Sequence, residues 1–372
     1  MDTSKFTCSL AALAAMSNKY GADPEYVLAG GGNTSFKSAE NLWIKGSGTS
    51  LATIQPQDFV VMDRAALAKM WTAAYPEDEA ARESAVLEDM MAARIPGENR
   101  RPSVETLLHD LFPQAYVLHV HPALVNGLTC SKEGKTTMER LFPDAVWVEA
   151  CKPGYILALE CKKVMDARKA ETGRAVQLLF LENHGIFFAG NTPEELDVLA
   201  EQVMGTLAAQ IKAAPDLTGT SYDTARAAQI AVLLEKLYGE EQPAKVCFLA
   251  NAQINAYDPA TESLSPDHIV YAKAKQLAVP SGASDEEITA AFAAFTAENG
   301  YKPRILFWQN GGMFACGASE KESSTALAVM LDAIKVTAYA ESFGGVSPMP
   351  AFLIDFIVNW EVERYRSNVS LK

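Results

Sequence analysis

The sequence predicts an α/β (α+β) protein with a mostly antiparallel sheet. Through the first two hundred residues, short apolar runs typical of strands alternate with longer segments in which apolar residues recur at helical spacing. The segment "AVQLLFLENHGIFFAG" (175–190) has the pattern of a buried hairpin that turns at residues 182–185. A later segment, 305–323, repeats this hairpin and the start of the helix that follows it. These patterns together favour layers of sheet and helix.

Length and charge limit what the chain can be. Its 372 residues suggest two domains, and the polar segment "PDLTGTSYDT" (215–224) predicts a boundary between residues 1–215 and 216–372. A net charge of −14 argues against nucleic acid or an anionic membrane as a partner. No apolar run reaches the roughly 18 residues that span a bilayer. Six cysteines without C-x-x-C spacing are expected to be free thiols of a cytoplasmic protein.

The first region is expected to contain the following elements in chain order. They are an N-terminal amphipathic helix, a glycine-rich turn between strands (30–35), strands at 42–45 and 58–62, a helix over 78–95, a helix within 102–112 that begins at Ser103 as N-cap, strands at 115–120, 145–150 and 155–159, and a helix over 192–214 with a capping box of Thr192 and Glu195. In the second region, the pattern predicts a helix over 225–238 and a strand at 245–251.

The internal repeat separates the two regions functionally. Residues 305–323 align with 178–196 without a gap, and an asparagine, two glycines and a phenylalanine coincide. His184 of the first copy corresponds to Gly311 of the second. We therefore predict that residues 216–372 form a diverged partial copy that has lost the contribution of this histidine.

Two histidines stand in one apolar strand, in "YVLHVHP" (116–122). Strand side chains repeat every two residues, so His119 and His121 are expected to point to the same face. With His184 from the hairpin turn they could hold a metal and leave one coordination position open, as catalytic zinc sites do. Glu105 could bind that metal or move a proton. The same spacing also fits histidines that merely pack in the core, and packing is the preferred interpretation for His109.

Glycine-rich turns near these residues indicate an anion site. "GGGNTSFK" (30–37) and "KGSGTS" (45–50) offer hydroxyls and free backbone N–H groups, and Ser103 adds donors at the start of a helix. Taken singly, each is better interpreted as an ordinary hairpin turn, and only the three together suggest a phosphate site. The first lacks the G-x-G-x-x-G spacing of a dinucleotide fingerprint.

Five motifs in order resemble the class II aldolase/adducin family: "GGGNTSFK", "WIKGSGTSLATI", "RPSVETLLH", "YVLHVHPALV" and "ENHGIFFAGNTPEE". They cover about residues 25–205. With "SPDHIVYAK" (265–273), the chain is most similar to the aldolase portion of bifunctional rhamnulose-phosphate aldolase/short-chain dehydrogenase proteins. The resemblance implies a central, mainly antiparallel sheet flanked by helices. Because the chain ends at Lys372, we expect no dehydrogenase activity.

The resemblance also implies roles for particular residues. His119, His121 and His184 would be ligands of Zn²⁺ or another divalent metal, and Glu105 would be the catalytic acid/base. The residues expected at the substrate phosphate are Gly32, Asn33, Ser47, Gly48 and Ser103. Val104 stands where the family usually has a second serine, so a shifted phosphate or a non-phosphorylated substrate is possible. The family also uses a tyrosine from a neighbouring subunit, which cannot be placed in this sequence.

The implied reaction is cleavage of a ketose, expected to be a ketose 1-phosphate, to dihydroxyacetone phosphate and an aldehyde through a zinc-bound enediolate. The same site would support a sugar-phosphate 4-epimerase or a sugar-acid phosphate decarboxylase. A non-catalytic, adducin-like scaffold is a third alternative. The resemblance further implies a homo-oligomer, for which a dimer of two-region chains is our hypothesis.

Overall fold

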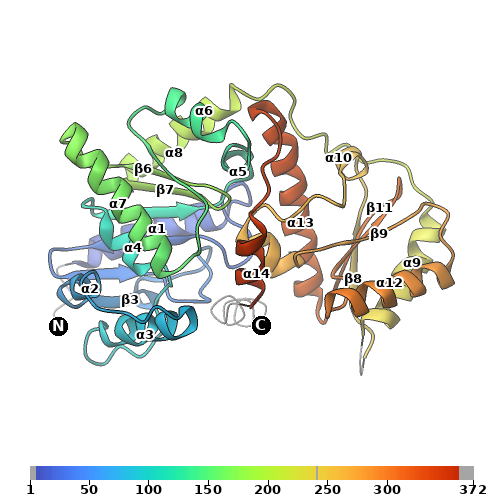
Figure 1. The fold of residues 1–372 in the computed structure, drawn as a ribbon, viewed down its shortest axis with the longest axis horizontal. Helices are drawn as coiled ribbons and strands as arrows, with labels where there is room; N and C mark the ends of the chain where they lie inside the picture. Colours follow the sequence, from blue (N-terminus) through green and yellow to red (C-terminus); the bar gives the residue numbers. More distant parts are fainter. Residues whose placement is uncertain (1–5, 240–241, 360–372) are drawn as a thin grey trace.

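The computed structural model describes residues 6–239 and 242–359, and they form two sheets with helices on both faces (Figure 1). The first sheet has seven strands in the order β3-β2-β1-β4-β7-β6-β5. Every neighbouring pair is antiparallel except β5 and β6. Its strands are β1 Asn33–Lys37, β2 Asn41–Ile44, β3 Val60–Asp63, β4 Tyr116–Val120, β5 Val146–Val148, β6 Leu178–Leu181 and β7 Gly185–Gly190. The predicted α/β class with a mainly antiparallel central sheet flanked by helices is confirmed.

Apolar residues from the two faces of this sheet form separate cores, because successive strand side chains point to opposite sides. The helices on one face are α1 Thr7–Gly21, α5 Ala123–Thr129, α6 Gly134–Leu141 and α8 Pro193–Ala208. On the other face lie α2 Arg64–Met70, α3 Glu79–Ala92, α4 Thr106–Leu111 and α7 Tyr155–Thr172. Val117 and Phe187 belong to the second core, so His119 on the same strand faces α4 and α7.

The second sheet has four strands in the order β8-β11-β10-β9. They are β8 Lys245–Leu249, β9 Leu277–Val279, β10 Ile305–Trp308 and β11 Gly312–Gly317. Neighbours are antiparallel except β9 and β10, which are parallel. This order and orientation match those of β4-β7-β6-β5 in the first sheet.

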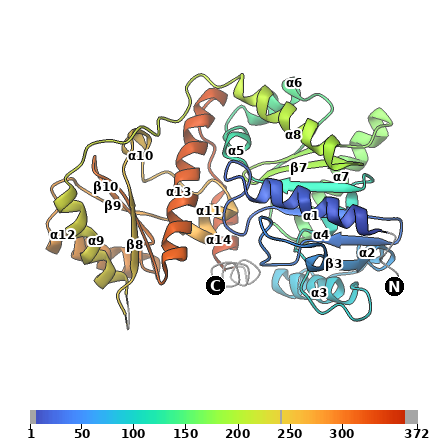
Figure 2. The same cartoon turned by 180° about the vertical axis from the view of Figure 1, so that it is seen from behind.

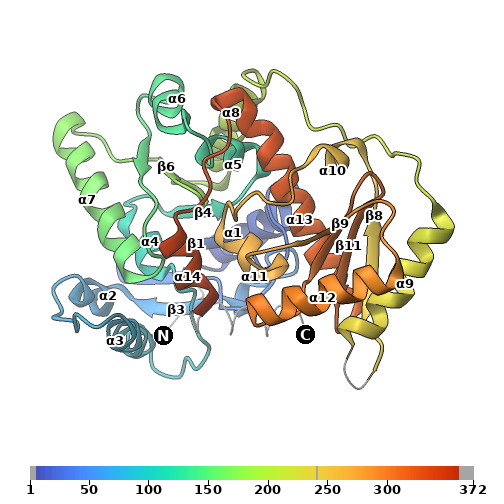
Figure 3. The ribbon, with the colours of Figure 1, turned by 45° about the vertical axis from the view of Figure 1, so that its right-hand side comes forward.

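Helices of the second region cover both faces of its sheet, and α13 lies between that sheet and the first region (Figures 2 and 3). They are α9 Thr224–Tyr238 and α12 Asp285–Asn299 on one face, α10 Ala252–Ala256 and α13 Glu320–Ala340 on the other, and α11 Pro266–Ala272 and α14 Ala351–Asn359, which pack on each other. Short 3₁₀ turns occur at Pro56–Asp58 and Glu341–Phe343. The long α13 also packs against α5. There a β-carbon added to Gly127 would lie 2.4 Å from Tyr339 Cβ, so the two helices are in close contact.

Three local predictions were wrong. Residues 155–159 are not a strand but the first turns of α7, which begins after Gly154 at a φ of 91°. Ser103 is not the N-cap of α4, because that helix begins at Thr106 with Glu105 at its N-cap. The side chain of Thr192 does accept from the backbone N–H of Glu195. The carboxylate of Glu195 accepts from Asn191 rather than closing a capping box.

Other predicted elements have slightly different ends. The glycine-rich segment 30–35 is a turn only as far as Gly32, because Asn33 begins β1. The hairpin within 175–190 turns where it was expected, between Leu181 and Gly185. In the described part of the chain, no helix has both the length and the apolarity that crossing a bilayer requires.

Candidate metal and substrate site

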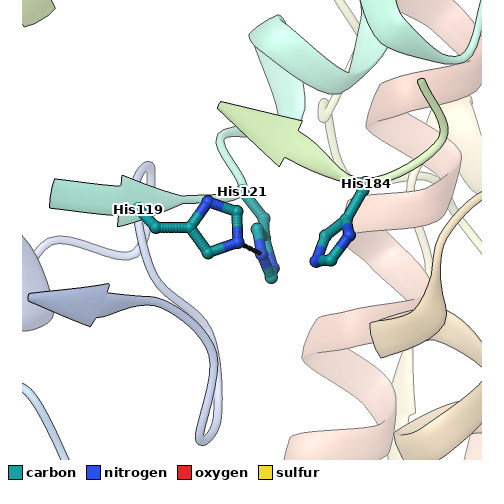
Figure 4. A group of neighbouring side chains, drawn as sticks. All are labelled: His119, His121 and His184. Carbon is teal, nitrogen blue, oxygen red and sulfur yellow. Dashed lines mark hydrogen bonds between the residues drawn. The ribbon is translucent and has the colours of Figure 1, made fainter. Parts of the chain in front are cut away.

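The three histidines predicted from sequence meet at one end of the first sheet (Figure 4). His119 is in β4, His121 lies just beyond the end of that strand, and His184 comes from the turn between β6 and β7. One ring nitrogen from each lies within 4.8 Å of the others. His119 is fully buried, whereas the side chains of His121 and His184 are 13% and 14% exposed, which leaves the cluster accessible from one side.

Glycine allows the hairpin turn to approach this strand. A β-carbon added to Gly185 would lie 2.5 Å from His121 Cδ2 and 2.6 Å from the carbonyl oxygen of Val120. Asn183 supports the turn in the left-handed conformation, with a φ of 55°. Asparagine adopts that conformation more readily than most residues. The "NHG" sequence therefore places His184 opposite His121.

In two of the rings, the hydrogen bond made by Nδ1 determines which nitrogen keeps its lone pair. His119 Nδ1 is 2.9 Å from the carbonyl oxygen of Ile186, which can only accept, so this nitrogen carries the proton. His121 Nδ1 is 2.6 Å from a carboxylate oxygen of Asp267 and donates in the same way. In their neutral forms, both rings then direct an Nε2 lone pair at the other, across 2.9 Å.

Glu105 adds negative charge at the same point. Its Oε1 lies 3.3 Å from His119 Nε2 and 3.6 Å from His184 Nε2, while its Oε2 accepts a hydrogen bond from Asn33. Burial favours the neutral carboxyl, whereas positive charge on the neighbouring rings of His119, His184 and His121 favours the carboxylate and lowers the pKa of Glu105. Burial and the nearby His121 lower the pKa of His184 to about 3, which favours its neutral form. Converging lone pairs beside a carboxylate fit a divalent cation, because a cation is what neutralises them.

A small cleft opens onto this group. All five residues expected to bind phosphate line it, as do Glu105, His121 and His184: the five are Gly32, Asn33, Ser47, Gly48 and Ser103. Gly32 and Gly48 have φ values of 69° and 81°, which side-chain-bearing residues rarely adopt. Val104 also lines the cleft, so the position that departs from the family pattern is in contact with the same space.

Two residues at this site were not predicted from the sequence, and one histidine considered as a possible ligand lies outside the site. Lys45 lines the cleft, with its Nζ 3.3 Å from the carbonyl oxygen of Gly30. A lysine at the end of the apolar run "LWIK" was the available signal. Asp267, which bonds to His121, comes from the second region, and no local pattern indicated it. His109 is buried away from the cluster, where its Nδ1 lies 2.8 Å from Ser35 Oγ.

The fold and this group of residues define a mixed α/β protein with a histidine-lined cleft at one end of a mostly antiparallel sheet. Residues 11–211 match the model of the class II aldolase and adducin N-terminal domain, which is more than half of the chain. The protein therefore belongs to the class II aldolase and adducin family.

One curated relative is the uncharacterized oxidoreductase YuxG of Bacillus subtilis (strain 168), which is 30% identical over 188 residues. The match covers 48% of this chain but only 26% of that relative, so the chain corresponds to a small part of its length.

Similar solved structures include the N-terminal class II aldolase domain of a conserved protein from Thermoplasma acidophilum, at 25% identity and a TM-score of 0.46 over 53% of this chain and 91% of that one. A sugar-phosphate aldolase from Thermotoga maritima is similar at 13% identity and a TM-score of 0.39, over 55% of this chain and 95% of that one. An L-fuculose-1-phosphate aldolase from Thermus thermophilus is similar at 15% identity and a TM-score of 0.34, over 53% and 93% of the two chains.

Proposed function

We propose that this protein is a metal-dependent aldolase that cleaves a ketose, in the first instance a ketose 1-phosphate, to dihydroxyacetone phosphate and an aldehyde. The observation that carries the proposal is the meeting of three imidazoles and the Glu105 carboxylate at the base of a cleft. Membership of the class II aldolase and adducin family agrees with it. The retained histidines argue against the adducin-like scaffold, since a scaffold has no use for them.

In this reaction the three histidines would bind the metal, and Glu105 would transfer the proton. His119, His121 and His184 would hold a divalent cation, Zn²⁺ or a substitute, whose charge stabilises an enediolate. In the condensation direction, Glu105 accepts a proton from the carbon beside the carbonyl, and the electron pair left behind attacks the aldehyde. In cleavage, the hydroxyl on the carbon that becomes the aldehyde loses its proton to water as the carbon–carbon bond breaks, and Glu105 returns a proton to the carbon that carried the electron pair. The lowered pKa of Glu105 favours the ionised carboxylate, which is the form that can accept a proton.

The cleft residues support a phosphorylated substrate. Ser47 and Ser103 supply hydroxyls, and the left-handed glycines at 32 and 48 leave backbone N–H groups unshielded by side chains. The buried Lys45 adds a positive charge to the same cleft. Such a combination suits an anion better than a neutral group. Asn33 takes a second part, because its side chain donates to Glu105.

The test combines metal content with product identification. We expect about one zinc per chain, and release of both dihydroxyacetone phosphate and an aldehyde from a panel of ketose 1-phosphates. Glu105→Gln should retain the metal but lose about 10²–10⁴-fold in turnover, the usual contribution of a general acid or base. Carbon dioxide release, or epimerisation without fragmentation, would instead identify the decarboxylase or the 4-epimerase. Wild-type protein that takes up no metal after zinc is added would refute the proposal.

We propose further that residues 216–372 are a diverged copy of part of residues 1–215. The matching order and orientation of β8-β11-β10-β9 and β4-β7-β6-β5 support this division. A cytoplasmic homo-oligomer stays a prediction, and light scattering that shows a monomer would exclude it.

A further inference from the structure

Asp267 links the second region to the histidine cluster. It is the second residue of α11, and its Oδ2 lies 2.6 Å from His121 Nδ1, 146 residues away in the chain. Both side chains are 13% exposed, so water screens this contact only weakly. Asp267 lies beyond residues 11–211, the part of the chain that matches the family model.

The hydrogen-bond acceptor that orients His121 differs in charge from the acceptor that orients His119. The outer nitrogen of His119 donates to a neutral carbonyl, whereas that of His121 donates to a carboxylate. Either partner fixes which nitrogen is protonated and so directs the Nε2 lone pair into the cluster. The carboxylate also makes the imidazole a stronger base and therefore a better ligand for a cation.

Two further contacts seat α11 against the glycine-rich loop. A β-carbon added to Gly31 would lie 3.2 Å from Asp267 Oδ2 and 3.7 Å from His121 Nδ1, so this glycine leaves the space that the pair occupies. Tyr271, one helical turn after Asp267, accepts a hydrogen bond from the backbone N–H of Gly30 at 3.2 Å. The loop that lines the cleft and the helix that carries Asp267 therefore fit together.

His268, the residue after Asp267, connects α11 to α13. His268 Nε2 lies 3.1 Å from Asp332 Oδ2 on α13. The helix α11 is thus held between the long helix of the second region and the loop of the first. The direction of the Asp267 carboxylate is set by this packing rather than by the residues next to it in sequence.

We propose that Asp267 is a positioning residue for the metal site: through His121, it orients one ligand and strengthens its hold on a divalent cation. Residues of the second region thereby complete a centre whose ligands all lie in the first. This inference rests on the metal site proposed above. It assigns to α11 a part in the chemistry that the matched family domain does not contain.

The test measures zinc affinity of the full chain by competition with a chromophoric chelator, which does not depend on turnover. Asp267→Ala should weaken zinc binding about 10–100-fold, the usual cost of losing a partner behind a ligating histidine. Asp267→Asn keeps an oxygen that can accept from His121 Nδ1 but removes the charge, so it should recover part of the loss. Gly31→Ala should weaken binding in the same direction, since its new methyl group displaces the carboxylate.

Asp332→Asn is the matched control, because it alters an aspartate–histidine contact of the same helix that does not reach the cluster. It should leave zinc affinity within about twofold of wild type. Wild-type zinc binding with unchanged affinity in Asp267→Asn and Asp267→Ala would overturn this inference and leave the metal site standing. An equal loss of zinc affinity in Asp332→Asn would also overturn it, because the position of α11, and not the Asp267 carboxylate, would then determine zinc affinity. Wild type that binds no zinc would refute the metal site and this inference together.

Discussion

The two sheets of this protein carry the same arrangement of four strands with different side chains at one end. In the first sheet, His119 of β4 is opposite Phe187 of β7. In the second, Phe248 of β8 is opposite Phe314 of β11. Phe248 therefore stands where the first sheet has His119, and by the same register Ala250 stands where it has His121. A shared strand order thus provides positions, and the residues at those positions decide whether a metal can bind.

The turns of the two hairpins have a similar backbone conformation. Asn183 and Asn310 precede the second strand of each hairpin at φ values of 55° and 59°. An added β-carbon at Gly312 would lie 2.7 Å from the carbonyl oxygen of Leu249, much as one at Gly185 would meet Val120. The backbone of the turn is similar in both hairpins, so its geometry alone does not bring histidines together.

The space beside the second turn is already filled. A β-carbon added to Gly311, the counterpart of His184, would lie 2.1 Å from a ring atom of Trp308. Trp308 is itself held by a hydrogen bond from its Nε1 to the carbonyl oxygen of Ser281, at 2.9 Å. Core packing therefore occupies the space beside the second turn, and we expect that a histidine placed there would not by itself create a metal site.

The largest expected effect comes from making the first turn like the second. His184→Gly should lower zinc content from about one per chain to a small fraction of that, and turnover by about 10³-fold, because one of three ligands is lost. Metal analysis and the product assay measure both quantities. His109→Gln, which changes a buried histidine outside the cluster, is the control and should keep its zinc. Substantial turnover in His184→Gly would contradict the assignment of this residue as a ligand.

A smaller effect is expected when a methyl group is added to each of the two matched glycines. Gly185→Ala presses on both His121 and the Val120 carbonyl, so it should weaken zinc binding about 10–100-fold and destabilise the fold by about 1–3 kcal/mol. Gly312→Ala should destabilise the fold comparably but leave zinc affinity unchanged. Chelator competition and denaturant unfolding separate the two quantities. Equal losses of zinc in both variants would mean that stability, and not the site, was being measured.

The described second sheet has no strands that correspond to β1–β3, and so no counterpart of the predicted phosphate residues. Ser47→Ala should raise KM for a phosphorylated ketose about tenfold with little change in kcat, because one hydrogen bond to a charged group is lost. Steady-state kinetics with the same sugar lacking phosphate provides the control, where no change is expected. A fall in kcat at constant KM would place Ser47 at the reacting atoms instead.

The smallest effect on metal binding is expected from the reverse exchange. Gly311→His should add no second zinc and should lower the free energy of unfolding by about 1–3 kcal/mol, because the imidazole has to displace Trp308. Metal analysis and denaturant unfolding report the two effects. A second zinc per chain would show that the strand arrangement alone is sufficient.

The sequence indicated the histidine cluster more reliably than it indicated some of the elements around it. The two-residue period of "HVH" and the aligned repeat singled out three histidines, and the three lie together. By contrast, the apolar residues 155–159 predict a strand but begin a helix, because five apolar residues do not distinguish a strand from a buried helix. In α7 the buried positions continue to Cys161 and Met165, and only this longer spacing identifies the helix.

Local sequence patterns did not predict contacts between segments that lie far apart in the chain. Asp267 lies in a motif noted only for its resemblance to relatives, and nothing nearby in sequence indicates that it reaches His121. Lys45 begins the segment 45–50, in which only the hydroxyls and backbone N–H groups were expected to meet an anion, yet its own side chain is buried and lines the cleft. Both positions depend on how whole elements pack, which residue spacing does not encode.

The close approach of Gly127 on α5 to Tyr339 on α13 has a consequence for how the chain unfolds. Helices in such contact cannot separate without exposing the apolar surface of both regions, so we expect calorimetry to show one cooperative transition rather than two. A ligand bound only to the native state raises the melting temperature of the whole cooperative unit. Zinc held by three histidines of the first sheet should therefore delay the melting of β8–β11, none of which touches it.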